Sequence, residues 1–381
     1  MKSLKNINFS HYINYAVIGI FTLVLSIITL TGGRFDSSML FLLEKIAISV
    51  VLSVSLSVVV GFLGELSLGH AGFMCVGAYM GGKLSVILEG VLGNTVPNLL
   101  ISLIAGGIVA AICGFIIGMP ALRLRGDYLA IVTLAFGEIV RSLFLNSSDE
   151  SFGGTLGLNT PRFDKKYLFI FAFLMVLLTL LVVQNFIRSK HGRAVTAIRD
   201  NEIAAKACGI NITKYKLLAF IISAFFAGIA GVLYSFSNYT VQSMTFGYNY
   251  SIKILVMVVL GGMGNINGAI VSAALITFLD TKLATVLTGD LAVLQNLIYA
   301  LILIVIVIYN NAPALKSFRD THNLSTFMRK LMRSKHNPAS IRDDAAKWDV
   351  VPTKIEMNEI LSIDMKPQNL DSDKPSKGGD K

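Results

Sequence analysis

Long runs of apolar residues recur along this 381-residue sequence, and they constrain its fold more than any other feature. Most are about 20 residues long, which at ~1.5 Å per helical residue spans the ~30 Å hydrocarbon core of a bilayer. The runs cover residues 12–31, 40–61, 71–88, 98–118, 127–145, 167–187, 214–235, 251–263, 268–286 and 292–309. Because 54% of the residues are hydrophobic and only 15% are charged, an ordinary soluble domain is excluded. We expect an all-α, polytopic membrane protein of roughly ten transmembrane helices.

Basic residues are distributed unevenly between the two sides that this topology creates. Most Lys and Arg lie on the side of both termini and the central loop, whereas the other side holds only Arg34, Arg162, Lys165 and Lys166. Cytoplasmic loops are enriched in Lys and Arg, so we expect both termini and the central loop to be cytoplasmic. Orientation also accounts for the formal net charge of +10, and nucleic acid is therefore not an expected partner.

Two glycine clusters, around residues 65–72 and 261–268, interrupt the apolar runs. Non-helical backbone at membrane depth persists only where protein buries it or where it lines a cavity. We therefore expect glycine-interrupted helices and a solute pathway at the first break. Its candidate lining residues are Glu65, Ser67, Gly69 and His70, with Glu138 from a later helix. Close packing of small residues explains the glycines almost equally well, and a histidine hydrogen-bonded to loop backbone is the commoner case.

Charged side chains at membrane depth need a partner or water, because their desolvation is costly. Glu138 and Arg141 lie three positions apart on one predicted helix, so they can pair with each other. Glu65, Lys83 and Lys253 have no obvious partner nearby in the sequence.

No sequence motif supports an enzyme, a cofactor site or a metal site. Residues 77–83 satisfy the G-x-x-x-x-G-K spacing, but Leu84 stands where a Ser or Thr would hold magnesium, and no strand precedes the segment. The cysteines Cys75, Cys113 and Cys208 lack metal-ligand spacing, and we interpret all three as packing residues. Catalytic residues are accordingly not expected.

The central loop contains a short predicted helix before the run at 214–235. Asp200 can cap this helix, and Glu202 lies in its first turn, where a negative charge is favourable. Ala204 and Ala205 favour helix, and Gly209 supplies a left-handed stop. Such a compact helix is either an interfacial linker or a knob that docks into a soluble partner.

Glu202, Ala204, Ala205 and Gly209 resemble the E-A-A-x-x-x-G loop of ATP-binding-cassette (ABC) import permeases, which meets the ATPase in that family. The surrounding stretch, together with GELSLGHAGFMCVGAY, LRLRGDYLAIVTLAFGEIVR and VVLGGMGNINGA, is similar to the permease subunit of branched-chain amino-acid ABC importers of the LivM type. The similarity runs from about residue 40 to 280. This sequence departs from the expected pattern at Lys253, where an acidic residue is expected, and at Asp280 and Lys282.

The resemblance implies a bacterial inner-membrane importer with several partners. These are cytoplasmic ATP-binding subunits, a second homologous permease subunit and an external binding protein that delivers leucine, isoleucine or valine. Glu202, Ala204, Ala205 and Gly209 would couple the chain to its ATPase. The alternatives are a related permease for urea or another small polar solute and, in a different class, an ion-coupled secondary transporter.

Three regions follow from the composition. Residues 1–310 form the transmembrane permease domain. Residues 311–336 combine basic and apolar residues at helical spacing, as in a segment on the anionic inner membrane surface. Residues 337–381 are polar and contain several Pro, which predicts a mostly disordered cytoplasmic tail.

Overall fold

The computed structural model describes residues 18, 19, 22, 37–124, 126–286, 300, 301 and 304. Its elements in chain order are α2 (Ser37–Ser57), η2 (Val58–Leu63), α3 (His70–Leu92), α4 (Val96–Ala121), α5 (Asp127–Leu145), α6 (Asp149–Phe152), β1 (Leu158–Asn159), α7 (Lys165–Arg188), α8 (Lys190–Asp200), α9 (Glu202–Ala207), α10 (Ile212–Asn238), β2 (Thr240–Val241), η3 (Ser243–Phe246), α11 (Tyr248–Gly261) and α12 (Ile266–Val286). Apart from isolated positions, the predicted runs 12–31 and 292–309 lie outside the described residues, as do the segment 311–336 and the tail 337–381.

Within this part of the chain, seven helices are long and apolar enough to cross a membrane. They are Ser37–Leu63, His70–Leu92, Val96–Ala121, Asp127–Leu145, Tyr167–Arg188, Ile212–Asn238 and Ile266–Thr285. The predicted run 251–263 is the 14-residue α11, which at ~1.5 Å per residue is too short to span a bilayer alone. The all-helical class is confirmed apart from one small sheet, and the total of roughly ten spans stays a prediction.

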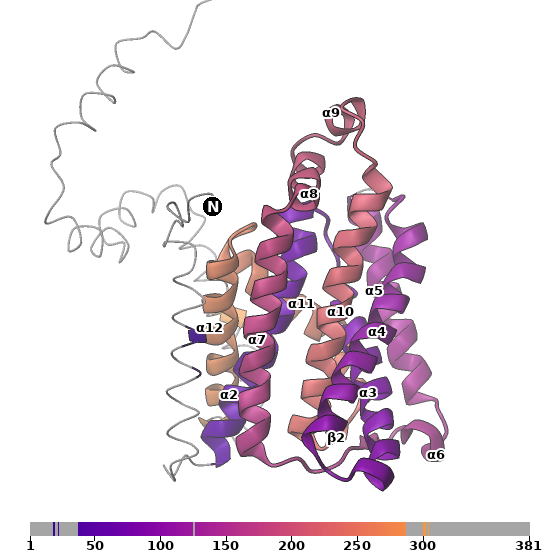
Figure 1. Ribbon diagram of the computed structural model, residues 1–381, viewed down its shortest axis with the longest axis vertical. Coiled ribbons are helices and arrows are strands. Elements are labelled where there is room, and N and C mark those ends of the chain that lie inside the picture. The colour runs from indigo at the N-terminus through magenta and orange to yellow at the C-terminus, as the bar shows by residue number, and fades with distance from the viewer. Residues whose placement is uncertain are drawn as a thin grey trace, which may run out of the picture. The chain divides into compact units, whose positions relative to one another are not determined.

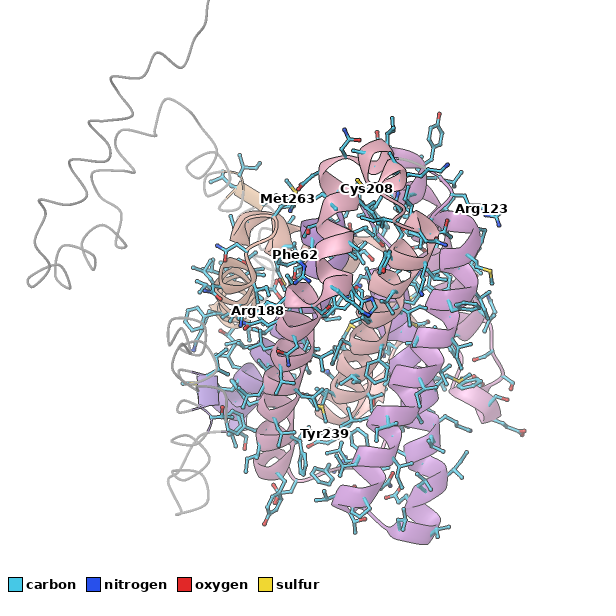
Figure 2. The ribbon with its side chains drawn as sticks, turned by 45° about the horizontal axis from the view of Figure 1, so that its top comes forward. Phe62, Arg123, Arg188, Cys208, Tyr239 and Met263 are labelled. Carbon is cyan, nitrogen blue, oxygen red and sulfur yellow. The ribbon has the colours of Figure 1, made fainter. Side chains whose placement is uncertain are left out.

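The small sheet was not expected from the sequence. β1 pairs antiparallel with β2, with Leu158 opposite Val241 and Asn159 opposite Thr240. β2 directly follows α10, whereas α8 and α9 precede α10 in the chain. The sheet and α9 therefore lie at opposite ends of α10, as the labels for Cys208 and Tyr239 indicate in Figure 2.

Helix α10 packs against α2, α3 and α4 at the centre of the bundle. Glycines permit these close approaches: a Cβ atom on Gly77 of α3 would lie 2.4 Å from the Cα atom of Gly228 in α10. Likewise, a Cβ atom on Gly231 would lie 2.0 Å from the carbonyl oxygen of Met74. Several glycines after the first break are therefore explained by helix packing rather than by a pathway.

One face of α4 has no cover within the described residues. Ile104, Ile108, Ile112 and Ile116 recur every fourth position, which aligns them on this face, and their side chains are 47% to 57% exposed. In a protein that spans a membrane, such a face contacts lipid or a neighbouring subunit.

Both predicted helix breaks are present. The first follows η2, a π-helical turn, and Gly64 leaves this turn with φ +79° before α3 begins at His70. The second separates α11 from α12, and Gly264 adopts φ +82° there. The turn η2, which leads into the first break, touches the second break, because a Cβ atom on Gly61 would lie 2.7 Å from the amide nitrogen of Gly264.

Candidate functional site

The central loop forms the short helix α9, which projects at one end of the bundle in Figure 1. Asn201 caps it, since its side-chain oxygen accepts hydrogen bonds from the amides of Ile203 and Ala204, each at 3.0 Å. The expectation that Asp200 caps this helix is wrong, because Asp200 ends α8 and only Asn201 has the extended backbone of a cap. The predicted left-handed stop is confirmed by Gly209, with φ +82°.

The side chains of α9 divide into an outer and an inner face. Ile203 is 79% exposed and Ala204 is also exposed, whereas Ala205 is only 4% exposed and belongs to the apolar core. A partner that docks on α9 would therefore meet Ile203 and Ala204, while Ala205 fits the helix onto its own chain. Cys208 is exposed, so its interpretation as a packing residue is wrong; Cys75 is buried as expected.

Lys216, in the first turns of α10, joins α9 to the first helix break. Its ammonium nitrogen lies 2.5 Å from Oε1 of Glu65 and 3.5 Å from Oε2 of Glu202. The Lys216 side chain is 3% exposed, and those of Glu65 and Glu202 are 14% and 31% exposed. Glu65 therefore has a partner after all, although 151 positions separate it from Lys216 in the sequence.

Arg199, at the end of α8, lies where the two breaks meet. Its Nη1 donates a hydrogen bond of 3.1 Å to the carbonyl oxygen of Gly61. A Cβ atom on Gly64 would lie 2.6 Å from Cγ of Arg199, and one on Gly264 would lie 3.5 Å from Nη1. No sequence motif indicated a role for Arg199 or Lys216, which differ from their neighbours only as basic residues on either side of the short helix.

The remaining pathway candidates of the first break are enclosed by protein. Ser67 and His70 are buried, and Nε2 of His70 lies 2.8 Å from Oγ of Ser55. Thus His70 pairs with a side chain of the preceding helix instead of the loop backbone, which is the commoner partner of such a histidine. A Cβ atom on Gly69 would lie 2.6 Å from the carbonyl oxygen of Thr133, so the break packs tightly against α5.

Glu138 is separate from this group. The predicted pair with Arg141 is confirmed, with Nε of Arg141 2.7 Å from Oε2 of Glu138. The other carboxylate oxygen accepts a hydrogen bond of 3.0 Å from the amide of Tyr248, at the start of α11. Glu138 thus ties α5 to α11, whereas Glu65 faces α9 and α10. Lys83 also has a partner, because its Nζ donates to the carbonyl oxygen of Glu150 at 3.0 Å.

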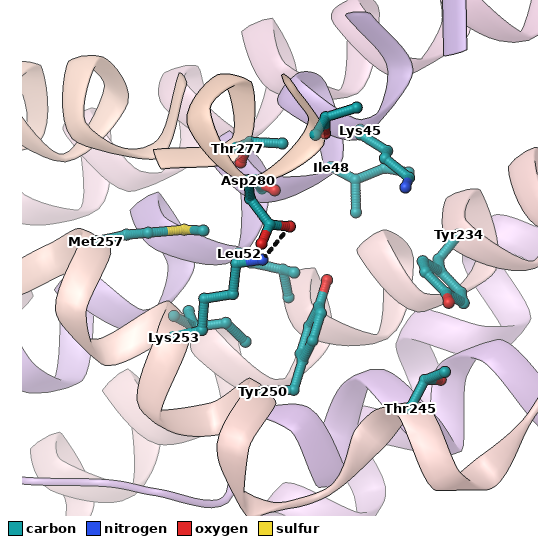
Figure 3. A pocket seen from close by; sticks show the side chains of 13 residues that line it. Lys45, Ile48, Leu52, Tyr234, Thr245, Tyr250, Lys253, Met257, Thr277 and Asp280 are labelled. Atoms are coloured by element: carbon teal, nitrogen blue, oxygen red, sulfur yellow. Dashed lines mark hydrogen bonds and ion pairs between the residues drawn. The ribbon is translucent and has the colours of Figure 1, made fainter. Parts of the chain in front are cut away.

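A pocket of about 300 Å³ lies between α2, α10, α11 and α12 and is drawn in Figure 3. Lys45 of α2 lines it, together with an ion pair between Nζ of Lys253 and Oδ2 of Asp280 at 2.5 Å. Lys253, which appeared to have no partner, is therefore paired with another position at which the sequence departs from the LivM-type pattern. Thr277 adds a buried hydroxyl oxygen without a hydrogen-bond partner among the described residues.

The rest of the pocket wall combines apolar side chains with hydroxyl groups, the latter from Ser49, Tyr234, Thr245, Tyr250 and Thr281. Ile48 and Leu52 come from α2, and Ile254 and Met257 come from α11. Figure 3 shows Leu52 and Met257 near the Lys253–Asp280 pair, with the ring of Tyr250 beside it. Charged groups and apolar side chains thus line one enclosure. No group of His, Cys, Asp and Glu that could hold a metal ion occurs in the described part of the chain.

Comparison with known proteins identifies related permeases. The family described as "Branched-chain amino acid transport system / permease component" matches residues 38–308. The chain is 36% identical over 260 residues to the high-affinity branched-chain amino acid transport system permease protein LivM of Salmonella typhimurium, covering 60% of each chain. It is 31% identical to the probable LivM of Methanocaldococcus jannaschii, covering 57% of this chain and 73% of the relative.

A more distant relative is the ribose import permease protein RbsC of Escherichia coli, at 24% identity over 78% of this chain and 92% of the relative. The alignment with LivM of Salmonella typhimurium spans only 60% of that relative's length. No solved structure matches the chain significantly.

Proposed function

This chain belongs to the family of branched-chain amino acid transport permease components, and from that premise we propose that it is the membrane subunit of an ABC importer for leucine, isoleucine and valine. It is a multi-pass membrane protein, and its family consists of permease components, not enzymes, as the sequence predicts. The observation that carries the proposal is the projecting helix α9, which Lys216 links to the first helix break.

In this proposal separate cytoplasmic subunits hydrolyse ATP, and their conformational changes move α9. Glu202, Ala204, Ala205 and Gly209 form the coupling element: Ala204 faces the partner, and Ala205 seats the helix on its own chain. Gly209 permits the chain to reverse into α10 because it adopts positive φ. Movement of α9 would reach the break at Glu65 through the shared Lys216.

The proposal places α9 and both termini in the cytoplasm of a bacterium, in agreement with the uneven distribution of Lys and Arg. A second homologous permease and an external binding protein complete the importer. Residues 1–310 form the permease domain, 311–336 lie on the membrane surface and 337–381 form a tail. Glu65, Ser67, Gly69 and His70 would line or gate the solute pathway, with Glu138 at a separate position.

The more distant similarity to a ribose permease supports one alternative solute, a sugar. Urea, suggested by the sequence resemblance, is a second. Reconstitution of the complete importer in proteoliposomes, with ATP inside and its binding protein outside, separates these solutes. We expect uptake of labelled leucine and little uptake of ribose or urea. Uptake of ribose or urea in preference to leucine would refute the assigned solute class.

The coupling role is tested by Ala204→Phe, because Ala204 is exposed in this chain and a bulky residue there disturbs only a partner. Overpacking costs ~1 to 3 kcal/mol, which weakens ATPase association by about 5- to 150-fold. The matched control is Ala204→Ser, which is expected to retain the ATPase. Membrane abundance, ATPase co-purification and leucine uptake are measured for both variants. A Phe variant that keeps its ATPase and full uptake would make α9 an interfacial linker.

A further inference from the structure

The pocket between α2, α10, α11 and α12 combines features that suit one class of solute (Figure 3). We propose that it holds the solute within the membrane and recognises a zwitterionic α-amino acid with a small aliphatic side chain. This inference rests on the proposed importer function, but it assigns the recognition to particular residues of this chain.

The charges in the pocket match both ends of a zwitterion. Asp280 offers an acceptor for an ammonium group, and Lys45 and Lys253 offer donors for a carboxylate. Lys253 and Asp280 pair with each other at 2.5 Å. A zwitterion can insert into such a pair without leaving a partly buried charge uncompensated, because it brings one charge of each sign.

Neutral solutes gain less from the same wall. Urea or a sugar offers no charge to exchange with the Lys253–Asp280 pair, so breaking the pair for either would leave two partly buried ions, 22% and 35% exposed, incompletely paired. Besides its hydroxyl groups, the wall presents Ile48, Leu52, Ile254 and Met257, whose apolar surface offers a sugar no hydrogen bond. This surface suits the aliphatic side chain of a branched amino acid.

Size and position support the same ligand class. The volume of about 300 Å³ is at the lower end of ligand pockets, which suits a single amino acid rather than a peptide. Lys45 lies eight positions after the start of α2, roughly 12 Å along the helix at 1.5 Å per residue. The pocket is therefore within the span rather than at its end. Ionic interactions are stronger there than at the surface, because less water surrounds the charges.

Helix α11 connects this pocket to the central loop, which carries α9. Lys253 and Met257 lie on α11, and the same helix ends at Gly261, directly before the break that contacts Arg199. A shift of α11 on solute binding would therefore reach the end of the bundle that carries α9.

The first experiment uses Thr281→Cys, because this partly exposed residue lines the pocket. The native cysteines are replaced, and the full chain is studied in nanodiscs within its complete importer without ATP. Reaction of the new thiol with a small methanethiosulfonate reagent is followed with leucine, urea or ribose present. We expect leucine to protect the thiol and the other two solutes to leave the rate unchanged. Equal rates with and without saturating leucine would overturn the pocket assignment.

The second experiment exchanges the charges with Lys253→Asp and Asp280→Lys in one chain. The exchange keeps an ion pair and the net charge, so a purely structural pair would tolerate it. If the pair binds the two charges of the zwitterion, the leucine concentration that gives half-protection should rise at least about tenfold. A hydrogen bond to a charged group contributes roughly that factor to affinity. Unchanged protection in the exchanged chain would contradict the proposal.

Lys45→Met provides an independent variant, because Lys45 is only half-buried and Met replaces it with an apolar side chain of similar length. It should also raise the half-protection concentration about tenfold. Lys83→Met is its matched control, since Lys83 lies outside the pocket, and it should behave like the parent chain. An unaltered Lys45→Met chain would count against the proposal even if the exchanged chain failed to fold.

Uptake by the parent importer separates this inference from the proposed function. If the parent complex imports no leucine with ATP and binding protein present, the proposed function is wrong. If uptake is normal but the pocket variants and the thiol assay show no effect, only the pocket assignment is wrong.

Discussion

Replacement of Lys216 by Met is expected to loosen the central loop around α9 without unfolding the bundle. The change removes the cation that lies 2.5 Å from Glu65 and 3.5 Å from Glu202, and it leaves the two carboxylates facing each other. Met keeps the length of the apolar part of the side chain. The loss should therefore be mainly electrostatic.

The size of the effect follows from the burial of the three groups. At an effective dielectric constant of ~20, the closer contact alone is worth about 6 to 7 kcal/mol before desolvation is subtracted. Removal of one member of a buried pair typically costs ~3 to 5 kcal/mol. Glu65 and Glu202 are 14% and 31% exposed, so water compensates part of the loss. We therefore expect the substitution to lower the free energy of local loop opening by ~3 kcal/mol. This decrease raises the equilibrium constant for opening about 150-fold.

Hydrogen exchange measures this local opening directly. The amides of Ala205 and Cys208 donate within the α9 turn, each at 3.0 Å, and peptides from this segment should exchange about 150-fold faster in Lys216→Met. Coupling should fail as well, so that the complete importer hydrolyses ATP with less leucine uptake per ATP. Lys216→Arg keeps the charge and should stay closer to the parent chain.

The matched control is Lys214→Met, which removes an exposed cation two positions earlier. It should leave both exchange and coupling almost unchanged. The reasoning is refuted if Lys216→Met exchanges at the parent rate and transports with parent coupling. It is also refuted if Lys214→Met shows an equal effect, because general loss of positive charge would then be the cause.

Three further predictions concern topology, the tail and packing. A membrane-impermeant thiol reagent should label Cys208 in inverted vesicles but not in intact cells, once the other cysteines are replaced; labelling only from outside would reverse the topology. Deletion of 337–381 should leave assembly and uptake largely intact, since so polar a tail cannot offset an ordering entropy of ~1 to 2 kcal/mol per residue; loss of uptake at normal abundance would indicate a folded regulatory role. Gly77→Leu should lower membrane abundance and Tm, because its Cβ would lie 2.4 Å from the Cα atom of Gly228, whereas Gly90→Leu meets open space; equal stability of the two would contradict this packing.

The sequence alone determined the features that depend on neighbouring residues. Apolar runs predicted the seven spans that the structure describes, and glycine clusters predicted both helix breaks. The pair between Glu138 and Arg141 followed from their spacing of three positions on one helix. The left-handed stop at Gly209 was also predictable, because a residue without Cβ directly after a short helix favours that conformation.

Only the tertiary structure decided which distant groups meet. The partner of Glu65 is Lys216, 151 positions away, and the partner of Lys253 is Asp280, 27 positions away. These pairings depend on how helices cross, and the crossings depend on side-chain shape and close glycine contacts that no local pattern encodes. The same applies to Ala205, since hydrophobic character alone cannot distinguish an alanine that faces a partner from one packed against its own chain.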